Sequence, residues 1–206
     1  MYNGVNEEFG PVTLLERQSI KEKYAQGADY FVFIGALHPR KNILRMLQAF
    51  DEFRKSYVSK IKMVIVGKKM WWTKEIENAY EQMQYRDQVI FTGRLLSSEL
   101  NRVIASSLAL TYVPYFEGFG IPILEGFRCE TAVITSNVTS MPEVAGDAAL
   151  LVDPFSVESI KLAMLLMAKD EPLRKSFIEK GKIRRHNFSW NKTASLLWNS
   201  IEKTVG

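Results

Sequence analysis

The sequence of 206 residues is poor in the side chains that most often hold metals or cross-link proteins. It contains one cysteine, Cys129, and two histidines, His38 and His186. A single cysteine excludes an internal disulfide and fits a reducing compartment, and we expect Cys129 to pack as a small core residue. No cysteine–histidine cluster has metal-ligand spacing, and no Asp-x-Asp motif is present. We therefore expect a site that needs no metal.

Long apolar runs and a strong net charge are also missing. No apolar segment approaches the roughly 20 residues of a membrane-spanning helix, and the polar first twenty residues do not resemble a signal peptide. The net charge of +4 fits a protein that binds small anions, but it is too weak to indicate a nucleic acid partner. We expect a cytoplasmic protein that does not bind nucleic acid.

What the sequence does contain is a regular alternation of short apolar runs and longer helical patterns. This alternation predicts an α/β fold, with a doubly wound parallel sheet of about six strands and extra C-terminal helices. We expect helix N-caps at Thr73, Ser97, Ser156 and Ser189, and prolines 122 and 172 in first helical turns. The expected strands are 30–34, 62–66, 89–91, 108–113, 132–135 and 149–152. The expected helices are roughly 12–26, 42–57, 73–84, 98–106, 121–129, 157–169, 172–186 and 190–204.

The two ends of the chain differ from the middle. Residues 1–11 are polar and contain glycine, and we interpret them as a remnant of an interdomain linker before a Rossmann-like domain at 12–206. The last helical pattern carries an apolar stripe that includes Trp190, Leu197 and Trp198. Two interpretations stay open for it: it packs on this domain, or it reaches toward another.

The most informative motif is a pair of glutamates across a glycine turn. Glu117 and Glu125 flank the run EGFGIPILE, which follows an expected strand and leads into an expected helix. We expect the backbone amides of Phe119, Gly120 and Ile121 to be free to bind a phosphate or a sugar hydroxyl. Glu125 is placed to accept hydrogen bonds from a diol such as a ribose, and Glu117 to bind a sugar or stabilise positive charge. Taken singly, each residue is better explained as a capping or a surface glutamate, but the two together with the glycines and the proline favour the functional interpretation.

A second motif, GALHPRKN at residues 35–42, follows the first expected strand. Gly35 allows a close approach of backbone to a ligand. Arg40 and Lys41 are expected at a helix N-terminus, where a phosphate would be bound. The motif is neither a Walker loop nor Gly-x-Gly-x-x-Gly, and the alternative is two solvated cations.

Other candidates carry less information. Leu95, after a strand end and a glycine turn, could support a base, although a tight turn explains it equally well. At least one of Trp71 and Trp72 is expected in the core. The basic stretch 180–185 is interpreted as a solvated face, with contact to an anionic membrane as the alternative. His38 is interpreted as a loop histidine rather than a catalytic base.

These motifs, together with TSNVTSMPE at 135–143, GDAALLVDP at 146–154 and FSW at 188–190, resemble a known family. They are similar to the C-terminal half of retaining GT-B glycosyltransferases, most closely family 4, the glycosyl transferases group 1 type. The resemblance covers nearly the whole chain in order. It implies a domain that binds a nucleotide-sugar donor.

The resemblance also implies roles for single residues. The glutamate matching Glu125 binds the ribose, and the one matching Glu117 lies beside the donor sugar as the catalytic candidate. The lysine matching Lys41 binds the diphosphate, amides matching Phe119 to Ile121 hold sugar and phosphates, and Leu95 falls where the base packs. Two departures stand out. Ala36 replaces a common arginine, a role that Arg40 takes over, and 130–132 replace a common Gly-x-Pro.

The activity that the resemblance implies is transfer of a hexose from a donor such as GDP-mannose or a UDP-hexose. The acceptor hydroxyl would belong to a glycan or lipid-linked substrate in polysaccharide or glycoconjugate synthesis. That acceptor would be bound by an N-terminal domain that we expect to be missing here, so this fragment alone is expected to be inactive. We expect no cofactor, and peripheral contact with the inner face of a membrane is left open. A sugar-nucleotide epimerase, a phosphorylase with pyridoxal phosphate and a non-catalytic nucleotide-binding module remain alternatives.

Overall fold

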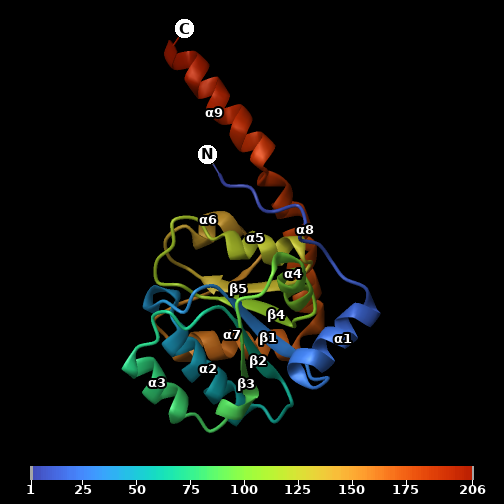
Figure 1. The fold of residues 1–206 in the computed structure, drawn as a ribbon, viewed down its shortest axis with the longest axis vertical. Helices are drawn as coiled ribbons and strands as arrows, with labels where there is room; N and C mark the ends of the chain where they lie inside the picture. Colours follow the sequence, from blue (N-terminus) through green and yellow to red (C-terminus); the bar gives the residue numbers. More distant parts are fainter. Residues whose placement is uncertain (1, 206) are drawn as a thin grey trace.

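A parallel sheet forms the centre of the fold (Figure 1). The structure is a computed structural model that describes residues 2–205. Within that range the sheet has six strands in the order β3-β2-β1-β4-β5-β6, and every neighbouring pair is parallel. The expected α/β class is therefore confirmed. The strands are β1 (Tyr30–Ile34), β2 (Lys62–Val66), β3 (Val89–Gly93), β4 (Ala109–Tyr112), β5 (Ala132–Ser136) and β6 (Leu150–Val152).

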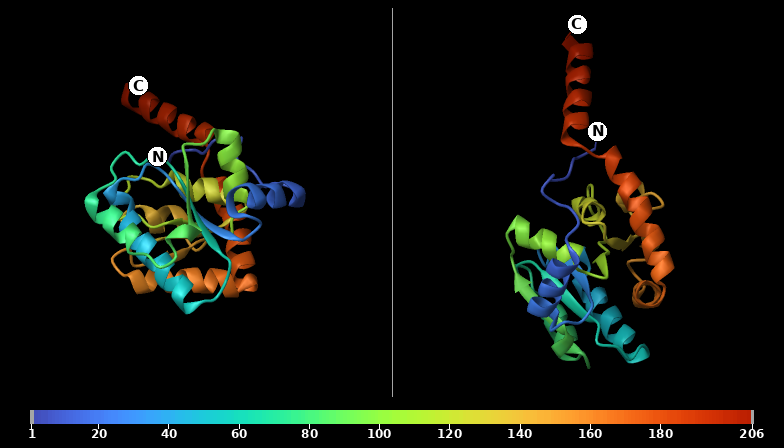
Figure 2. Two further views of the ribbon diagram at one scale, coloured as in Figure 1. Left: turned by 60° about the horizontal axis from the view of Figure 1, so that its bottom comes forward. Right: turned by 90° about the vertical axis from the view of Figure 1, so that its right-hand side faces the viewer.

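Helices cover both faces of this sheet (Figure 2). In one layer α2 packs against α3 and α7, and in the other α4 packs against α1 and α5. Helix α8 contacts α5, α7 and β5. The helices are α1 (Leu14–Ala25), α2 (Ile43–Ser56), α3 (Lys74–Glu81), α4 (Ser97–Ala105), α5 (Ile121–Arg128), α6 (Met141–Ala145), α7 (Val157–Lys169), α8 (Glu171–Arg184) and α9 (Trp190–Val205).

Most expected helix starts are correct. The side chains of Thr73, Ser156 and Ser189 each accept a hydrogen bond from the first turn of the following helix. The expectation for Ser97 is wrong, because Ser97 is the first helical residue and the extended Leu96 occupies the cap position without a side-chain bond. The five-residue helix α6 was not expected, since it is too short to show helical periodicity.

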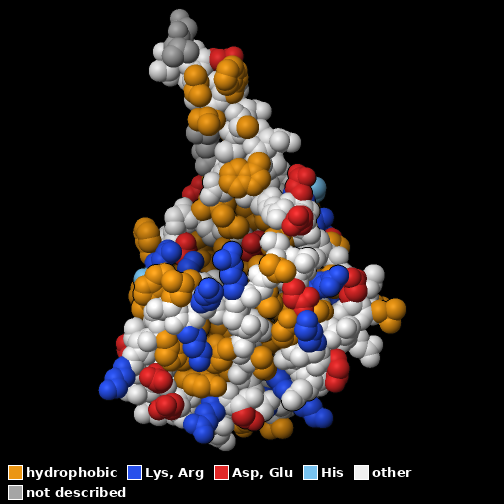
Figure 3. All heavy atoms as spheres, viewed as in Figure 1, with side chains coloured by type: hydrophobic (Ala, Val, Ile, Leu, Met, Phe, Trp, Pro, Cys, Tyr) orange, Lys and Arg blue, Asp and Glu red, His pale blue; other side chains and the backbone are white. Residues whose placement is uncertain are grey.

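The N-terminal segment lies on the domain surface rather than free of it. Val5 and Phe9 are buried in the core cluster, and the amide of Gly10 donates to Asn101 Oδ1 at 2.8 Å. That residues 1–11 are a linker remnant stays a prediction. At the other end, α9 projects away from the sheet (Figure 1), and apolar side chains remain visible along it (Figure 3).

The strand order reverses between β1 and β4. From β1 the chain builds outward through β2 to β3, and from β4 it builds the other way through β5 to β6. The connections that follow β1 and β4 therefore lead to opposite halves of the sheet. In open α/β sheets this switch point is where ligands bind.

Candidate active site

The loops after β1 and β4 meet at this switch point through charged side chains. The Glu117 carboxylate accepts a hydrogen bond from Arg40 Nη1 at 2.9 Å and forms an ion pair with Lys41 Nζ. The amide of Tyr115 donates to the Arg40 carbonyl at 2.9 Å, which joins the two loops through their backbones. Two motifs that the sequence analysis singled out separately thus form one acid–cation cluster.

The two cations directly precede α2, as expected, but they belong to a separate short turn that the sequence did not indicate. Arg40 and Lys41 lie in a 3₁₀ turn, Pro39–Lys41, and the left-handed Asn42 separates this turn from α2. The turn begins at His38, whose Nδ1 accepts from the Arg40 amide at 3.2 Å. His38 is therefore a capping loop residue in this structure.

Burial sets the electrostatics of the cluster. The side chains of Lys41 and Glu117 are 12% and 13% exposed, whereas Arg40 is far more open. Desolvation lowers the pKa of Lys41, and the neighbouring Glu117 opposes that shift. The positive charge of the poorly solvated Lys41 is only partly neutralised, because Glu117 is a single carboxylate that also pairs with Arg40. The cluster therefore has capacity for a further anion.

Tyr112 is a member of this cluster that the sequence analysis missed. It is the last residue of β4, it is fully buried, and its hydroxyl accepts a hydrogen bond from Lys41 Nζ. Burial raises the pKa of Tyr112, and the charge of Glu117 adds to the effect. In the sequence, Tyr112 could have been noticed as a hydroxyl-bearing side chain at the end of an apolar run, five residues before Glu117.

The glycine turn after Glu117 has the expected form. Gly120 adopts φ +104° and precedes α5, with Pro122 in the first turn. Among residues 2–205, the amides of Phe119, Gly120 and Ile121 donate no hydrogen bond. Ser140 Oγ donates to the Glu117 carbonyl at 2.7 Å and ties the turn to the loop after β5. Three backbone donors are thus held beside the cluster.

Glu125 lies one turn into α5, in a different environment from Glu117. Burial raises its pKa to about 7. Its carboxyl makes no hydrogen bond or ion pair within the described part of the chain. A half-buried carboxyl of this kind is able to accept hydrogen bonds from ligand hydroxyls.

A cavity of about 440 Å³ lies at the carboxyl ends of β1, β2 and β3, and its lining includes Gly35 and Leu95. The structure thus brings together two residues that the sequence analysis proposed for one ligand. Gly67, which also lines the cavity, has no room for a side chain, because a Cβ there would lie 1.8 Å from the Gly35 carbonyl. Volumes of about 300–1,000 Å³ are typical of small-molecule sites. Glu125 does not line this cavity, but α5 packs against α4, which begins at the cavity wall.

The remaining candidates have structural explanations. Trp72 packs against the core, as expected for one of the two tryptophans, and Trp71 is exposed. Cys129 is a buried free thiol. No group of three or more His, Cys, Asp or Glu side chains within 2–205 is arranged to hold a metal. No helix in the same range is both long and apolar enough to cross a membrane.

The sheet, its switch point and the acid–cation cluster beside a ligand-sized cavity define a Rossmann-like domain of the kind found in GT-B proteins. The chain belongs to the family described as Glycosyl transferases group 1, whose profile matches residues 16–184. This finding confirms the family that the motifs resembled.

Three similar proteins illustrate the relationship. The O-antigen chain mannosyltransferase B of Escherichia coli is 30% identical over 198 residues, which are 96% of this chain and 52% of that protein. The C-terminal domain of a group 1 glycosyl transferase (LpcC) from Francisella tularensis has a TM-score of 0.77 at 23% identity, covering 89% of this chain and 97% of that one. Anabaena Alr3699/HepE in complex with UDP-glucose has a TM-score of 0.88 at 13% identity, covering 98% of this chain and 57% of that one. The chain thus spans about half of the E. coli relative.

Proposed function

We propose that this chain is the donor-binding domain of a retaining glycosyltransferase that transfers a hexose from a nucleotide-diphosphate sugar to a hydroxyl acceptor. The observation that carries the proposal is the cluster at the switch point, where Lys41 and Arg40 face Glu117 beside the Leu95 cavity. The names of one relative and one similar structure support the proposal. The E. coli relative is named a mannosyltransferase of O-antigen chains, and the Anabaena structure holds UDP-glucose.

In this proposal each part of the site has one task. The cavity at Leu95 takes the base, Glu125 accepts hydrogen bonds from the ribose, and Arg40, Lys41 and the amides of the glycine turn hold the diphosphate. The bond from the anomeric carbon to the phosphate oxygen breaks, and its electrons leave with the diphosphate. The acceptor oxygen bonds to the same face of that carbon, and its proton passes to the departing phosphate oxygen.

Glu117 is the proposed catalytic residue. Its carboxylate would stabilise the positive charge that develops on the sugar as the phosphate leaves. Because the cations and amides neutralise the leaving group, the proposal needs no metal or cofactor. The acceptor, the place in polysaccharide or glycoconjugate synthesis and the membrane contact are also proposals. Against membrane contact, Lys180, Lys182 and Arg185 form ion pairs with acids of the chain itself.

Calorimetric titration of UDP, GDP, GDP-mannose and UDP-glucose into the chain tests the proposal. We expect binding at millimolar or lower concentration, with one base preferred. Glu125→Ala should weaken binding of the preferred nucleotide by about 1–3 kcal/mol through loss of charged hydrogen bonds. The absence of binding by all four compounds at millimolar concentration would overturn the proposal, and an unchanged affinity in Glu125→Ala would remove Glu125 from the ribose role.

A further inference from the structure

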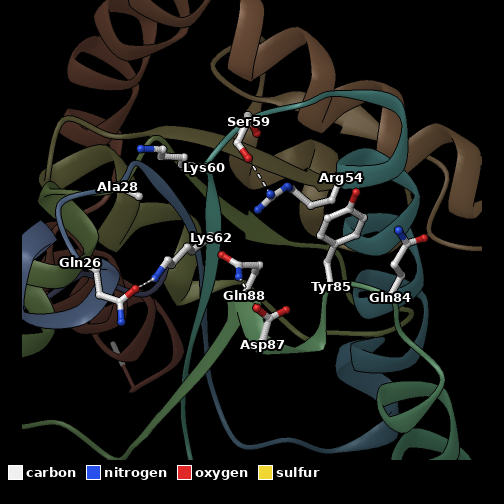
Figure 4. Close-up of a pocket in the computed structure, with 10 residues that line it drawn as sticks. All are labelled: Gln26, Ala28, Arg54, Ser59, Lys60, Lys62, Gln84, Tyr85, Asp87 and Gln88. Carbon is white, nitrogen blue, oxygen red and sulfur yellow. Dashed lines mark hydrogen bonds between the residues drawn. The ribbon is translucent and has the colours of Figure 1, made fainter.

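A second cavity, of about 620 Å³, lies at the opposite edge of the sheet, where strands begin (Figure 4). Its wall is formed by residues just before β1, β2 and β3, together with Arg54 from α2. The cluster at Glu117 and the Leu95 cavity lie where the strands end. The second cavity is therefore separate from the proposed donor site.

Arg54 is one of two buried cations in this cavity. It is 7% exposed, and its Nη1 and Nη2 donate to the carbonyls of Ile61 at 2.6 Å and Ser59 at 2.5 Å. Its guanidinium lies 4.8 Å from the centre of the Tyr85 ring. These contacts hold the side chain in place, but its buried Nε has no hydrogen-bond partner within residues 2–205. Because this Nε is closed off from solvent, Arg54 contributes its positive charge to the cavity wall rather than a free donor.

Lys62 is the second buried cation. It is the first residue of β2, is 8% exposed, and donates to Gln26 Oε1 at 2.5 Å (Figure 4). Neither Lys62 nor Arg54 has a carboxylate within 4.0 Å in the described chain. Exposed Lys60 adds a third positive charge to the wall, and Asp87, which is hydrogen-bonded to Gln88, is the one acid in it. Three cations thus face one acid, and two of them are buried without an ionic partner.

We propose that this cavity binds a phosphomonoester, with its phosphate on Lys62 and Lys60 and with Arg54 adding positive charge to the same wall. A phosphate dianion would balance the charge of the cations and accept hydrogen bonds from the ammonium groups of Lys62 and Lys60. The cavity is much larger than a phosphate alone, and the amides of Gln26, Gln84 and Gln88 can hydrogen-bond a hydroxylated organic group. The ligand class is therefore a small phosphorylated polyol rather than free phosphate.

Calorimetric titration of sn-glycerol 3-phosphate and of inorganic phosphate into the 206-residue chain tests this site. We expect the glycerol ester to bind more tightly than free phosphate. Lys62→Gln and Lys60→Gln should each weaken its binding by about tenfold, as expected when one charge-assisted hydrogen bond is lost. Lys192→Gln, which removes the same charge from an exposed position on α9, is the matched control and should leave the affinity unchanged.

The proposed donor site supplies the competing explanation, because Lys41 also favours phosphate. Lys41→Gln should not change the affinity for glycerol phosphate, and glycerol phosphate should not change the affinity for UDP. Loss of binding in Lys41→Gln with unchanged binding in Lys60→Gln would overturn the proposal, as would no binding at all. Equal affinities for the two probes would overturn the recognition of the organic group. Because Lys60 is exposed, Lys60→Gln keeps the test valid if Lys62→Gln fails to fold.

Discussion

Glu117 and Glu125 begin as two similar acids around one glycine turn, and their surroundings make them chemically different. Glu117 is ion-paired with both Lys41 and Arg40, whereas Glu125 has no partner in the described residues and its pKa is raised to about 7 by burial. The Glu117 carboxylate is therefore paired with two cations when no ligand is bound. The Glu125 carboxyl is sensitive to pH in the neutral range.

Glu125 should make stability depend on pH. The folded chain keeps the proton up to about pH 7, and the unfolded chain releases it near the ordinary value of 4.5. The folded state therefore binds more protons in this window, so the free energy of unfolding falls as pH rises from about 4.5 to 7. The contribution is at most about 3.5 kcal/mol, at ~1.4 kcal/mol per pKa unit.

Glu125→Gln should abolish that contribution. Urea unfolding at pH 5 and pH 8 is the measurement, and the variant should gain stability relative to the natural sequence as pH rises. Parallel pH profiles for the two proteins would show that Glu125 is ionised at neutral pH in the folded chain. The same variant isolates the Glu125 part of any pH dependence in UDP binding from ionisation of the diphosphate itself.

Tyr112 should act on the diphosphate through Lys41. Tyr112→Phe removes the hydroxyl that accepts from Lys41 Nζ, so Lys41 keeps only its ion pair with Glu117 and its contact with the ring. On the proposed function, affinity for UDP should fall about three- to tenfold, since about 0.5–1.5 kcal/mol of hydrogen bonding is lost. Affinity for uridine, which has no diphosphate, should not change.

A second buried tyrosine provides the control for this experiment. Tyr30 lies on β1, is fully buried, and its hydroxyl donates to the Val103 carbonyl at 2.6 Å. Tyr30→Phe should lower the free energy of unfolding as Tyr112→Phe does, but leave UDP affinity unchanged. If both variants weaken UDP binding equally, the effect of Tyr112 is on stability and not on Lys41.

At the scale of elements, the sequence predicted the sheet well because its strands are continuous apolar runs. The expected ranges for β1 and β2 match the structure at both ends, and both strands are buried throughout. Elements without such a pattern were missed or misplaced. The 3₁₀ turn at Arg40 depends on local capping by His38, and α6 is shorter than two helical turns.

The candidate site was predictable in part for the same reason. Gly35, Leu95 and Glu117 each follow a predicted strand, and the family resemblance assigned all three to one donor site. The Lys41–Tyr112 contact depends on side-chain packing across two strands. The cavity at Arg54 and Lys62 depends on burial of residues that appear as ordinary surface cations in the sequence. Neither the Lys41–Tyr112 contact nor this cavity is indicated by a motif or a periodic pattern in the sequence.

Gly67 should be essential for the close approach of the loops after β1 and β2. A methyl group at this position would lie 1.8 Å from the carbonyl oxygen of Gly35, so backbone must move. Gly67→Ala should therefore lower the free energy of unfolding by roughly 2–3 kcal/mol in urea denaturation. Gly10→Ala is the control, because a Cβ there meets no atom within 4 Å. Equal stability of the two variants would mean that the loops separate at little cost.

At the scale of the whole molecule, a packed sheet domain carries a helix with few contacts to it. Trp198 is 62% exposed, and Leu197 and Ile201 on the same helix are also exposed. In contrast, Ile160, Met164 and Met167 of α7 are buried where α7 packs against α2. Since most helical stability in proteins comes from packing of the apolar face, we expect α9 to be only weakly stable while that face is uncovered.

Hydrogen–deuterium exchange should show this difference within one chain. At low protein concentration we expect the amides of α9 to exchange within seconds, while those of α7 and β1 remain protected, because local opening is easiest where few apolar contacts are lost. The measurement is repeated at tenfold higher concentration. Protection of α9 that appears only there would show that a second copy covers the stripe. Protection equal to that of α7 at both concentrations would contradict the expectation and show that α9 packs on its own domain in solution.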